Sequence, residues 1–176
     1  DVAHTTYVAS TLNVTPLAFD DTYAPIVIAN TTINTALSSG FSVVDNDFYG
    51  YASGNAVVKA SITVATATPP AHGTLNLVAS GANVGKFTYT PTPGYTGADS
   101  FTYTISNGVA GAPAPSITGT VNLTVAGPIV WYVDPNVGST GTGTLASPFK
   151  TVAEAVTAIG VNTAQRIFIY GGGATQ

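Results

Sequence analysis

The sequence predicts an all-β protein, a two-sheet β-sandwich followed by a short strand–helix–strand segment. Three observations predict this fold class. Up to about residue 127, β-branched and aromatic residues recur in short stretches, and Gly, Pro, Asn and Asp separate these stretches. Helical periodicity is nearly missing over the same region. After Gly127-Pro128 the pattern changes, and one amphipathic helix stands between two apolar stretches.

The clearest strands are two neighbouring segments, residues 86–90 and 100–106, in which apolar residues alternate with threonine or serine. The alternating apolar residues are Phe87, Tyr89, Phe101, Tyr103 and Ile105. Such alternation buries one face of a strand and exposes the other, as a sandwich requires. The Pro- and Gly-rich stretch 91–97 cannot continue a ladder, so we expect the two strands to lie across a turn from each other.

Further strands are predicted by β-branched stretches bounded by turn residues. They cover residues 25–28, 56–65, 73–78 and 116–125. Roughly seven short strands spaced by turn signals are typical of an immunoglobulin-like Greek-key sandwich, which we place over residues 18–127.

Residues 128–176 form a separate predicted segment. An apolar strand over 129–133 contains the only tryptophan, a helix is predicted over 152–159, and strand character returns over 166–170. Thr151 and Glu154 have the spacing of a capping box. The segment has too few residues to bury both of its faces. We therefore expect the natural polypeptide to continue, or another chain to cover it.

Residues 1–17 contain a further strand pattern, Tyr7 to Val14, outside the sandwich as drawn. It could be the first strand of this domain, the end of a preceding repeat, or a strand donated to a neighbouring subunit. Because the chain begins at Asp1 and has no basic, apolar leader, we interpret it as a processed product or an excised fragment.

Composition favours an extracellular protein. Charged residues are 7% of the chain, well below the roughly 25% of an average soluble domain. A net charge of −4 with four scattered cations argues against nucleic acid as a partner, and no apolar run could span a bilayer. The absence of cysteine excludes disulfides and thiolate chemistry, and it is compatible with export in bacteria.

Five motifs occur in the order and spacing of a known family. They are Phe19 to Tyr23, Val43 to Gly50, Pro70 to Leu75, Phe87 to Pro91, and Gly97 to Thr104. Over roughly 110 residues this pattern resembles the bacterial cadherin-like and immunoglobulin-like tandem repeats of large surface adhesins. The resemblance implies a β-sandwich module that spaces, stiffens or displays other domains of a long secreted protein.

The segment after residue 127 resembles a second family. Val130 to Asn136, followed by Gly143 to Ala155, is similar to the N-terminal cap of a right-handed parallel β-helix. That fold occurs both in surface adhesins and in polysaccharide lyases. The resemblance implies that any catalytic coil would lie beyond Gln176.

The cadherin-like resemblance also implies calcium as a ligand, because the repeats hold oxygen ligands in these motifs. The corresponding carboxylates here are Asp20, Asp21, Asp45, Asp47 and Asp99. Calcium takes six to eight hard oxygens, which loops rich in Asp and Asn can supply. Phe48-Tyr49-Gly50 departs from the family pattern, which usually has a further acidic residue there. The alternative is that these Asp residues cap turns.

No catalytic residue is predicted. His4 and His72 are the only histidines, neither has a partner at a suggestive spacing, and both read as turn or terminal residues. Glu154 is the sole glutamate, and the capping box accounts for it. The sequence contains no nucleophile elbow, phosphate loop or metal-binding histidine pair.

The sequence thus favours a non-catalytic structural or adhesive module of a secreted bacterial surface protein or extracellular filament. We expect its partners to be copies of itself or neighbouring repeats, joined by strand addition, and a cell-surface glycan is a further candidate. Two alternatives stay open: the accessory front of a β-helix polysaccharide lyase or hydrolase, and a carbohydrate-binding module.

Overall fold

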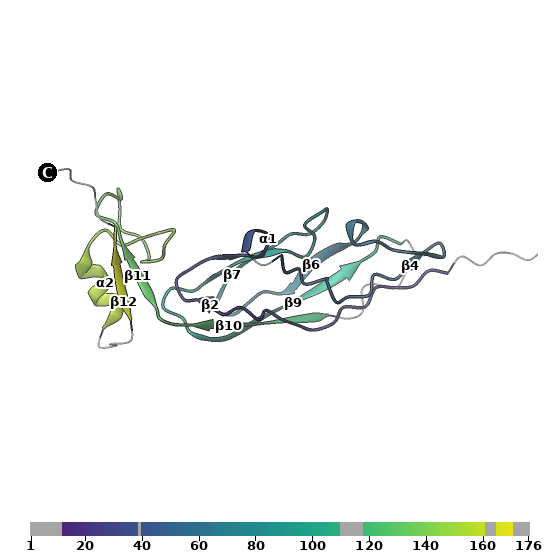
Figure 1. The fold of residues 1–176 in the computed structure, drawn as a ribbon, viewed down its shortest axis with the longest axis horizontal. Helices are drawn as coiled ribbons and strands as arrows, with labels where there is room; N and C mark the ends of the chain where they lie inside the picture. The colour runs from purple at the N-terminus through teal and green to yellow at the C-terminus, as the bar shows by residue number, and fades with distance from the viewer. Residues whose placement is uncertain (1–11, 39, 110–117, 161–164, 171–176) are drawn as a thin grey trace, which may run out of the picture.

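The structure is a computed structural model that describes residues 12–38, 40–109, 118–160 and 165–170. Figure 1 shows a long β-sandwich with a small β-strand and helix unit at the end that carries the C-terminus. In the parts of the chain that are described, no helix is long and apolar enough to cross a membrane.

One layer of the sandwich is a five-stranded sheet. Its strands run in the order β1–β10–β9–β6, and β2 also pairs with β10. The bounds are β1 Asp21–Thr22, β2 Val27–Ile28, β6 Thr63–Thr68, β9 Gly97–Ser106 and β10 Gly119–Ala126. β9 pairs antiparallel with both β10 and β6, whereas β1 and β2 run parallel to β10.

The facing layer is a three-stranded sheet in the order β3–β8–β7. Its strands are β3 Ile33–Asn34, β7 Gly73–Leu77 and β8 Phe87–Pro91. The predicted strands at 86–90 and 100–106 therefore follow one another across a turn, but they lie in opposite sheets. The smaller elements are α1 Thr35–Ser38, the hairpin β4 Tyr51–Ala52 and β5 Asn55–Ala56, and the 3₁₀ turn Lys59–Ser61.

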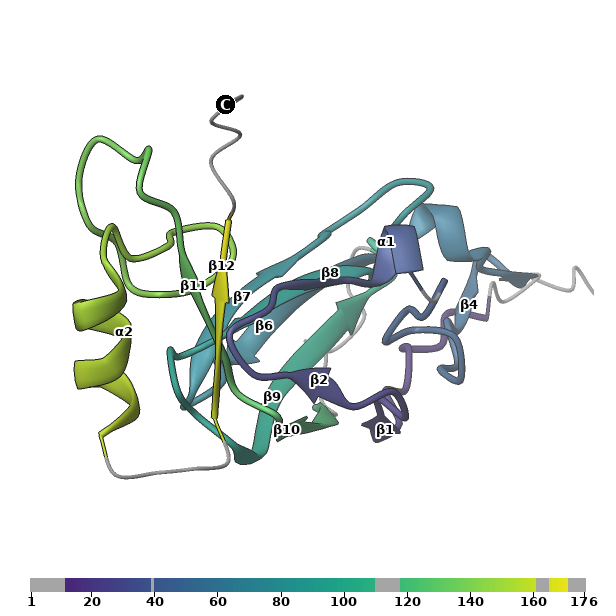
Figure 2. The same cartoon turned by 60° about the vertical axis from the view of Figure 1, so that its left-hand side comes forward.

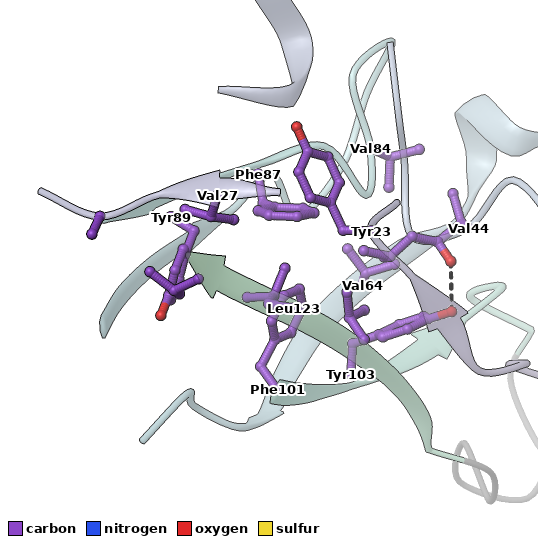
Figure 3. Close-up of a cluster of buried hydrophobic side chains, with 14 of the residues drawn as sticks. Tyr23, Val27, Val44, Val64, Val84, Phe87, Tyr89, Phe101, Tyr103 and Leu123 are labelled. Atoms are coloured by element: carbon purple, nitrogen blue, oxygen red, sulfur yellow. Dashed lines mark hydrogen bonds between the residues drawn. The ribbon is translucent and has the colours of Figure 1, made fainter. Parts of the chain in front are cut away.

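The core lies between the two sheets, where the alternating side chains predicted from the sequence meet (Figure 3). Phe87 of β8 and Phe101 of β9 pack edge to face with their ring centroids 5.2 Å apart. Tyr89 and Tyr103, the next alternating positions, are fully buried. Alternation therefore predicted correctly which residues point inward, because each strand buries only every second side chain.

One predicted strand, 56–65, is wrong over residues 57–62, which lie between β5 and β6. Residues 59–61 form a 3₁₀ turn, and β6 begins only at Thr63. Val57 donates its backbone N–H to the Gly50 carbonyl, which keeps residue 57 with the β4–β5 hairpin. The chain must then turn to reach the five-stranded sheet, and one short 3₁₀ turn achieves this.

The stretch before residue 18 joins the same body. Val14 and Tyr51 exchange backbone hydrogen bonds at 2.9 and 3.1 Å, and Leu17 and Phe48 do so at 2.8 and 3.1 Å. The described body therefore includes residues 14–17, which the sequence interpretation left outside the sandwich. Most of the predicted strand Tyr7 to Val14 lies outside the described residues.

The C-terminal segment is built from β11 (Val130–Val133), α2 (Val152–Ile159) and β12 (Arg166–Ile169), as the sequence predicts. β11 and β12 are parallel, and α2 lies beside them (Figure 2). The predicted capping box is present: the Glu154 backbone N–H donates to the Thr151 hydroxyl at 3.3 Å, and the Thr151 N–H donates to the Glu154 carboxylate at 2.9 Å.

Candidate functional site

A group of polar contacts in the sandwich surrounds the hydroxyl of Tyr103. This residue lies on β9, and its ring crosses the core so that the hydroxyl reaches the loops at the far side (Figure 3). Four oxygens surround it: the carbonyls of Val43 at 2.6 Å and Phe19 at 3.1 Å, and the carboxylates of Asp47 at 2.9 Å and Asp21 at 3.0 Å. Tyr103 thus joins three stretches of chain that are distant in sequence.

The Tyr103 hydroxyl cannot donate to all four oxygens. It has one proton, and carbonyls and ionised carboxylates only accept. A carboxyl group that retains its own proton can instead donate to the tyrosine oxygen. The geometry therefore favours a proton on one of the two carboxyl groups, Asp21 or Asp47.

Burial of these two carboxyl groups also favours their protonated form. Asp21 is 8% exposed, and its removal from water is the main reason that its pKa rises to about 7. The hydrogen bond from Tyr103 opposes this rise, and the neighbouring carboxylates of Asp47, Asp45 and Asp20 add to it. Burial also raises the pKa of Asp47, while hydrogen bonds from the Phe19 N–H and from Tyr103 oppose that rise. Asp21 is therefore the better candidate for the protonated group.

Asp20 and Asp45 lie beside this cluster but bond elsewhere. Asp20 accepts a hydrogen bond from the Thr120 N–H at 2.8 Å, which fastens the chain before β1 to β10. Asp45 forms an exposed ion pair with Lys59 and accepts from the Ser42 N–H at 3.2 Å. Asp20 therefore ties two distant stretches of the chain together, and Asp45 holds the loop at Ser42.

Asp99 lies apart from the other four predicted ligands. It is buried on β9, and its carboxylate accepts from three backbone N–H groups, those of Ala71, His72 and Ser100, at 2.9 to 3.0 Å. The Tyr89 hydroxyl also donates to it at 2.7 Å. Asp99 and Tyr103 are four residues apart on an extended strand, so their Cα atoms are separated by roughly 13 Å. The structure therefore does not bring the five predicted ligands into one site.

Over the described ranges, no group of three or more carboxylate or imidazole side chains is arranged to hold a metal ion. Calcium binding stays a prediction that rests on the sequence resemblance. Of the five predicted ligands, Asp21 and Asp47 are the two whose carboxyl groups meet, at the Tyr103 hydroxyl and beside the carbonyls of Phe19 and Val43.

The residues considered for catalysis have other partners. His72 is exposed and stacks on Tyr95, with ring centroids 4.0 Å apart and planes 7° from parallel. Glu154 caps α2, and hydrogen bonds from the Thr140 hydroxyl, from Thr151 and from the Lys150 backbone lower its pKa. His4 lies outside the described residues.

Sequence reasoning missed the central role of Tyr103, which it assigned only to the core. A signal was available, because a buried tyrosine hydroxyl needs a hydrogen-bond partner. The partner could not be identified from the sequence, since Phe19, Val43 and Asp47 reach it only through the folded loops.

Comparison with known proteins supports the reading of the sandwich. Residues 13–124 match the family model described as a bacterial Ig domain. A search of curated proteins finds no match for the chain. The matched residues end before β11, so the resemblance of the C-terminal segment to a β-helix cap is not addressed. The matched residues begin near Val14, where the backbone pairing of the sandwich also begins, and they include strands of both sheets. The chain therefore belongs to the bacterial Ig domain family.

Proposed function

We propose that this chain is a non-catalytic structural module of a secreted bacterial surface protein or extracellular filament, and that neighbouring subunits assemble by strand addition. Family membership supports the bacterial structural role. The low content of charged residues supports an extracellular setting, because such a chain must interact with water mainly through hydroxyl and amide groups.

The observation that carries the proposal is the open edge of β12. Arg166 and Tyr170 donate their backbone N–H groups to the carbonyls of Ile129 and Val133, so these alternate residues face β11. The backbone groups of Ile167 and Ile169 consequently point away from β11. No third strand borders β12 in the part of the chain that the structure describes.

The side chains at this edge have little of the protection that exposed strands usually carry. Phe168 and Ile169 are 51% and 50% exposed, and the one charged residue of the strand, Arg166, is at its beginning. Natural proteins protect such edges with charges, prolines or covering elements, because an open edge accepts another strand. The edge of β12 is thus suited to receive a strand from a neighbouring subunit.

The candidate donor is the N-terminal region. A strand donated to a neighbouring subunit is one of the three readings that the sequence leaves open for residues 1–17, and residues 14 and 17 already pair within their own chain. We therefore assign the donor role to residues 1–11.

Assembly is tested with concentrated full chain, by light scattering after size exclusion and by negative-stain electron microscopy. Ile169→Lys places a charge on the edge of β12, and deletion of residues 1–11 removes the donor. Both changes should abolish assemblies that the unaltered chain forms. Val58→Lys is the matched control, because Val58 is a 61% exposed valine in the sandwich and receives the same charge.

An unaltered chain that stays monomeric at every concentration would contradict strand addition. Assemblies that persist in both altered chains would do the same. Loss of assembly in the Val58→Lys chain as well would indicate a general effect of charge and would also count against the edge of β12.

A second candidate function rests on the parallel pairing of β11 with β12. Parallel strands joined through a helix or loop are the pairing that a parallel β-helix repeats, so the segment could begin such a domain in a polysaccharide lyase or hydrolase. Affinity electrophoresis through gels cast with pectin, alginate or xylan tests this candidate. Retardation by one polysaccharide would support it, and mobility equal to that in a plain gel would contradict it.

A further inference from the structure

The sandwich and the C-terminal segment meet at a seam with a very short connection. β10 ends at Ala126 and β11 begins at Val130, so residues 127–129 alone lie between them. The buried apolar cluster of the sandwich also continues through Ile129, Trp131 and Val133 into the C-terminal segment. The two parts therefore share a core instead of being separated by a linker.

Asn30 lies at the centre of this seam. It follows β2 and is 1% exposed. Its side-chain amide donates to the Val130 carbonyl of β11 at 3.0 Å, while its side-chain oxygen accepts from the Gly94 N–H of the sandwich at 2.7 Å. The Asn30 backbone carbonyl accepts from the Leu145 N–H at 3.4 Å. One residue thus holds the sandwich turn at Gly94 and two stretches of the C-terminal segment.

The chemistry of this position is specific to asparagine. The backbone of Asn30 has a φ of 63°, a left-handed conformation that asparagine adopts more readily than most residues. Its amide carries a donor and an acceptor, which match one carbonyl and one N–H across the seam. Aspartate would keep the shape but replace the donor with a second acceptor, opposite the Val130 carbonyl.

Trp131 also packs against Gly94 at the seam. A Cβ at Gly94 would lie 3.3 Å from the indole ring, so the sandwich turn passes directly over the tryptophan. Trp131 also stacks on Phe149, with ring centroids 5.7 Å apart, and donates its indole N–H to Gln165. The ring therefore contacts both parts of the chain.

We propose that Asn30 fixes the angle between the bacterial Ig domain and the C-terminal segment, so that the chain behaves as one rigid body. Burial of Asn30 also excludes it from carrying an N-linked glycan in the folded chain, although Asn30-Thr-Thr32 has the acceptor pattern. The proposal concerns the joint alone and does not depend on filament assembly.

The experiment measures distances between two spin labels by pulsed electron paramagnetic resonance. The chain has no cysteine, so Thr74→Cys in β7 and Ala158→Cys in α2, both exposed positions, label the two parts specifically. The labelled parent should give one narrow distance distribution. Asn30→Asp and Asn30→Gly should broaden it and shift its mean, whereas Asn76→Asp, the same change at an exposed position in β7, should leave it unchanged.

Three results would overturn the proposal. The first is a broad distribution in the labelled parent, and the second is a narrow, unshifted one in Asn30→Asp. The third is loss of the folded sandwich in both Asn30 variants, judged by circular dichroism, since Asn30 would then support the sandwich and not the joint. Asn30→Gly retains access to the left-handed backbone, which separates loss of the side-chain bonds from backbone strain.

Discussion

At the scale of single residues, the hydroxyl of Tyr103 connects separate loops of the sandwich. Its hydroxyl is the shared partner of Asp21, Asp47 and two carbonyls. Burial and the adjacent carboxylates raise its own pKa, so it remains a neutral hydroxyl. Loss of this single oxygen would leave several buried groups without their partner.

Tyr103→Phe is therefore expected to destabilise the fold by about 2–4 kcal/mol, because buried carboxyl and carbonyl groups lose a hydrogen bond without regaining water. Urea unfolding followed by circular dichroism measures the change. Tyr51→Phe is the matched control, since Tyr51 is a half-buried tyrosine whose ring packs on Phe48. Equal effects of the two substitutions would show that the hydroxyl of Tyr103 has no special role.

The raised pKa of Asp21 predicts a pH dependence. This pKa is about 7 in the folded chain and 3.8 in the reference state, so the folded chain binds the proton more tightly between these values. The free energy of unfolding should fall as the pH rises from about 4 to about 7, by on the order of 1–3 kcal/mol. Asp21→Asn should flatten this slope. A stability that rises over the same pH interval would contradict the assignment.

Calcium provides a further test of the same carboxyl groups. The carboxyl groups of Asp21 and Asp47 both contact the Tyr103 hydroxyl, and Asp47 raises the pKa of Asp21, so a bound cation would relieve the repulsion between the two groups once they are ionised. If calcium binds at these two carboxyl groups, it should increase the melting temperature at about pH 8, and Asp47→Asn should abolish the increase. Asp99→Asn should retain the increase, because Asp99 belongs to a different set of bonds. An unchanged melting temperature would contradict calcium binding by these carboxyl groups.

At the scale of the elements, the sheets depend on glycines that leave room for tyrosine rings. A Cβ at Gly119 of β10 would lie 2.6 Å from the Tyr103 ring, closer than van der Waals contact allows. Gly119→Ala should therefore cost about 1–3 kcal/mol through overpacking. Gly138→Ala is the control, since a Cβ there meets nothing within 4 Å, and it should be close to neutral. Thermal unfolding of both variants gives the comparison, and an equally mild effect at Gly119 would contradict this packing.

The longer elements were predictable from the sequence, because they depend on local patterns, whereas the short elements β1, β3, α1 and β4 were not predicted. β8 and β9 were predicted from alternation, and α2 from its capping box. The assignment of β8 and β9 to opposite sheets was not predictable, since the turn between them permits either arrangement. The clustering of Asp21 with Asp47, and the separation of Asp99 from both, also depend on tertiary structure, because spacing in sequence does not specify which loops meet.

At the scale of the whole molecule, few charges contribute to stability. Within the described residues, Lys59 and Asp45 form the one ion pair, and it is exposed. At about pH 5, raising the salt concentration from about 0.05 M to about 1 M sodium chloride should change the free energy of unfolding by less than about 0.5 kcal/mol. Urea unfolding at both concentrations checks this expectation. A larger decrease would mean that ion pairing matters more than the described contacts indicate.

The placement of Trp131 has a practical consequence for following the joint. It is the only tryptophan in the chain, and it is 6% exposed between Phe149 and the turn at Gly94. Its intrinsic fluorescence therefore comes from the seam and from nowhere else. A red shift of the emission maximum that precedes the loss of the β-sheet circular dichroism signal would report water entering the seam while the sandwich is still intact, so opening of the joint can be timed separately from unfolding without any added probe.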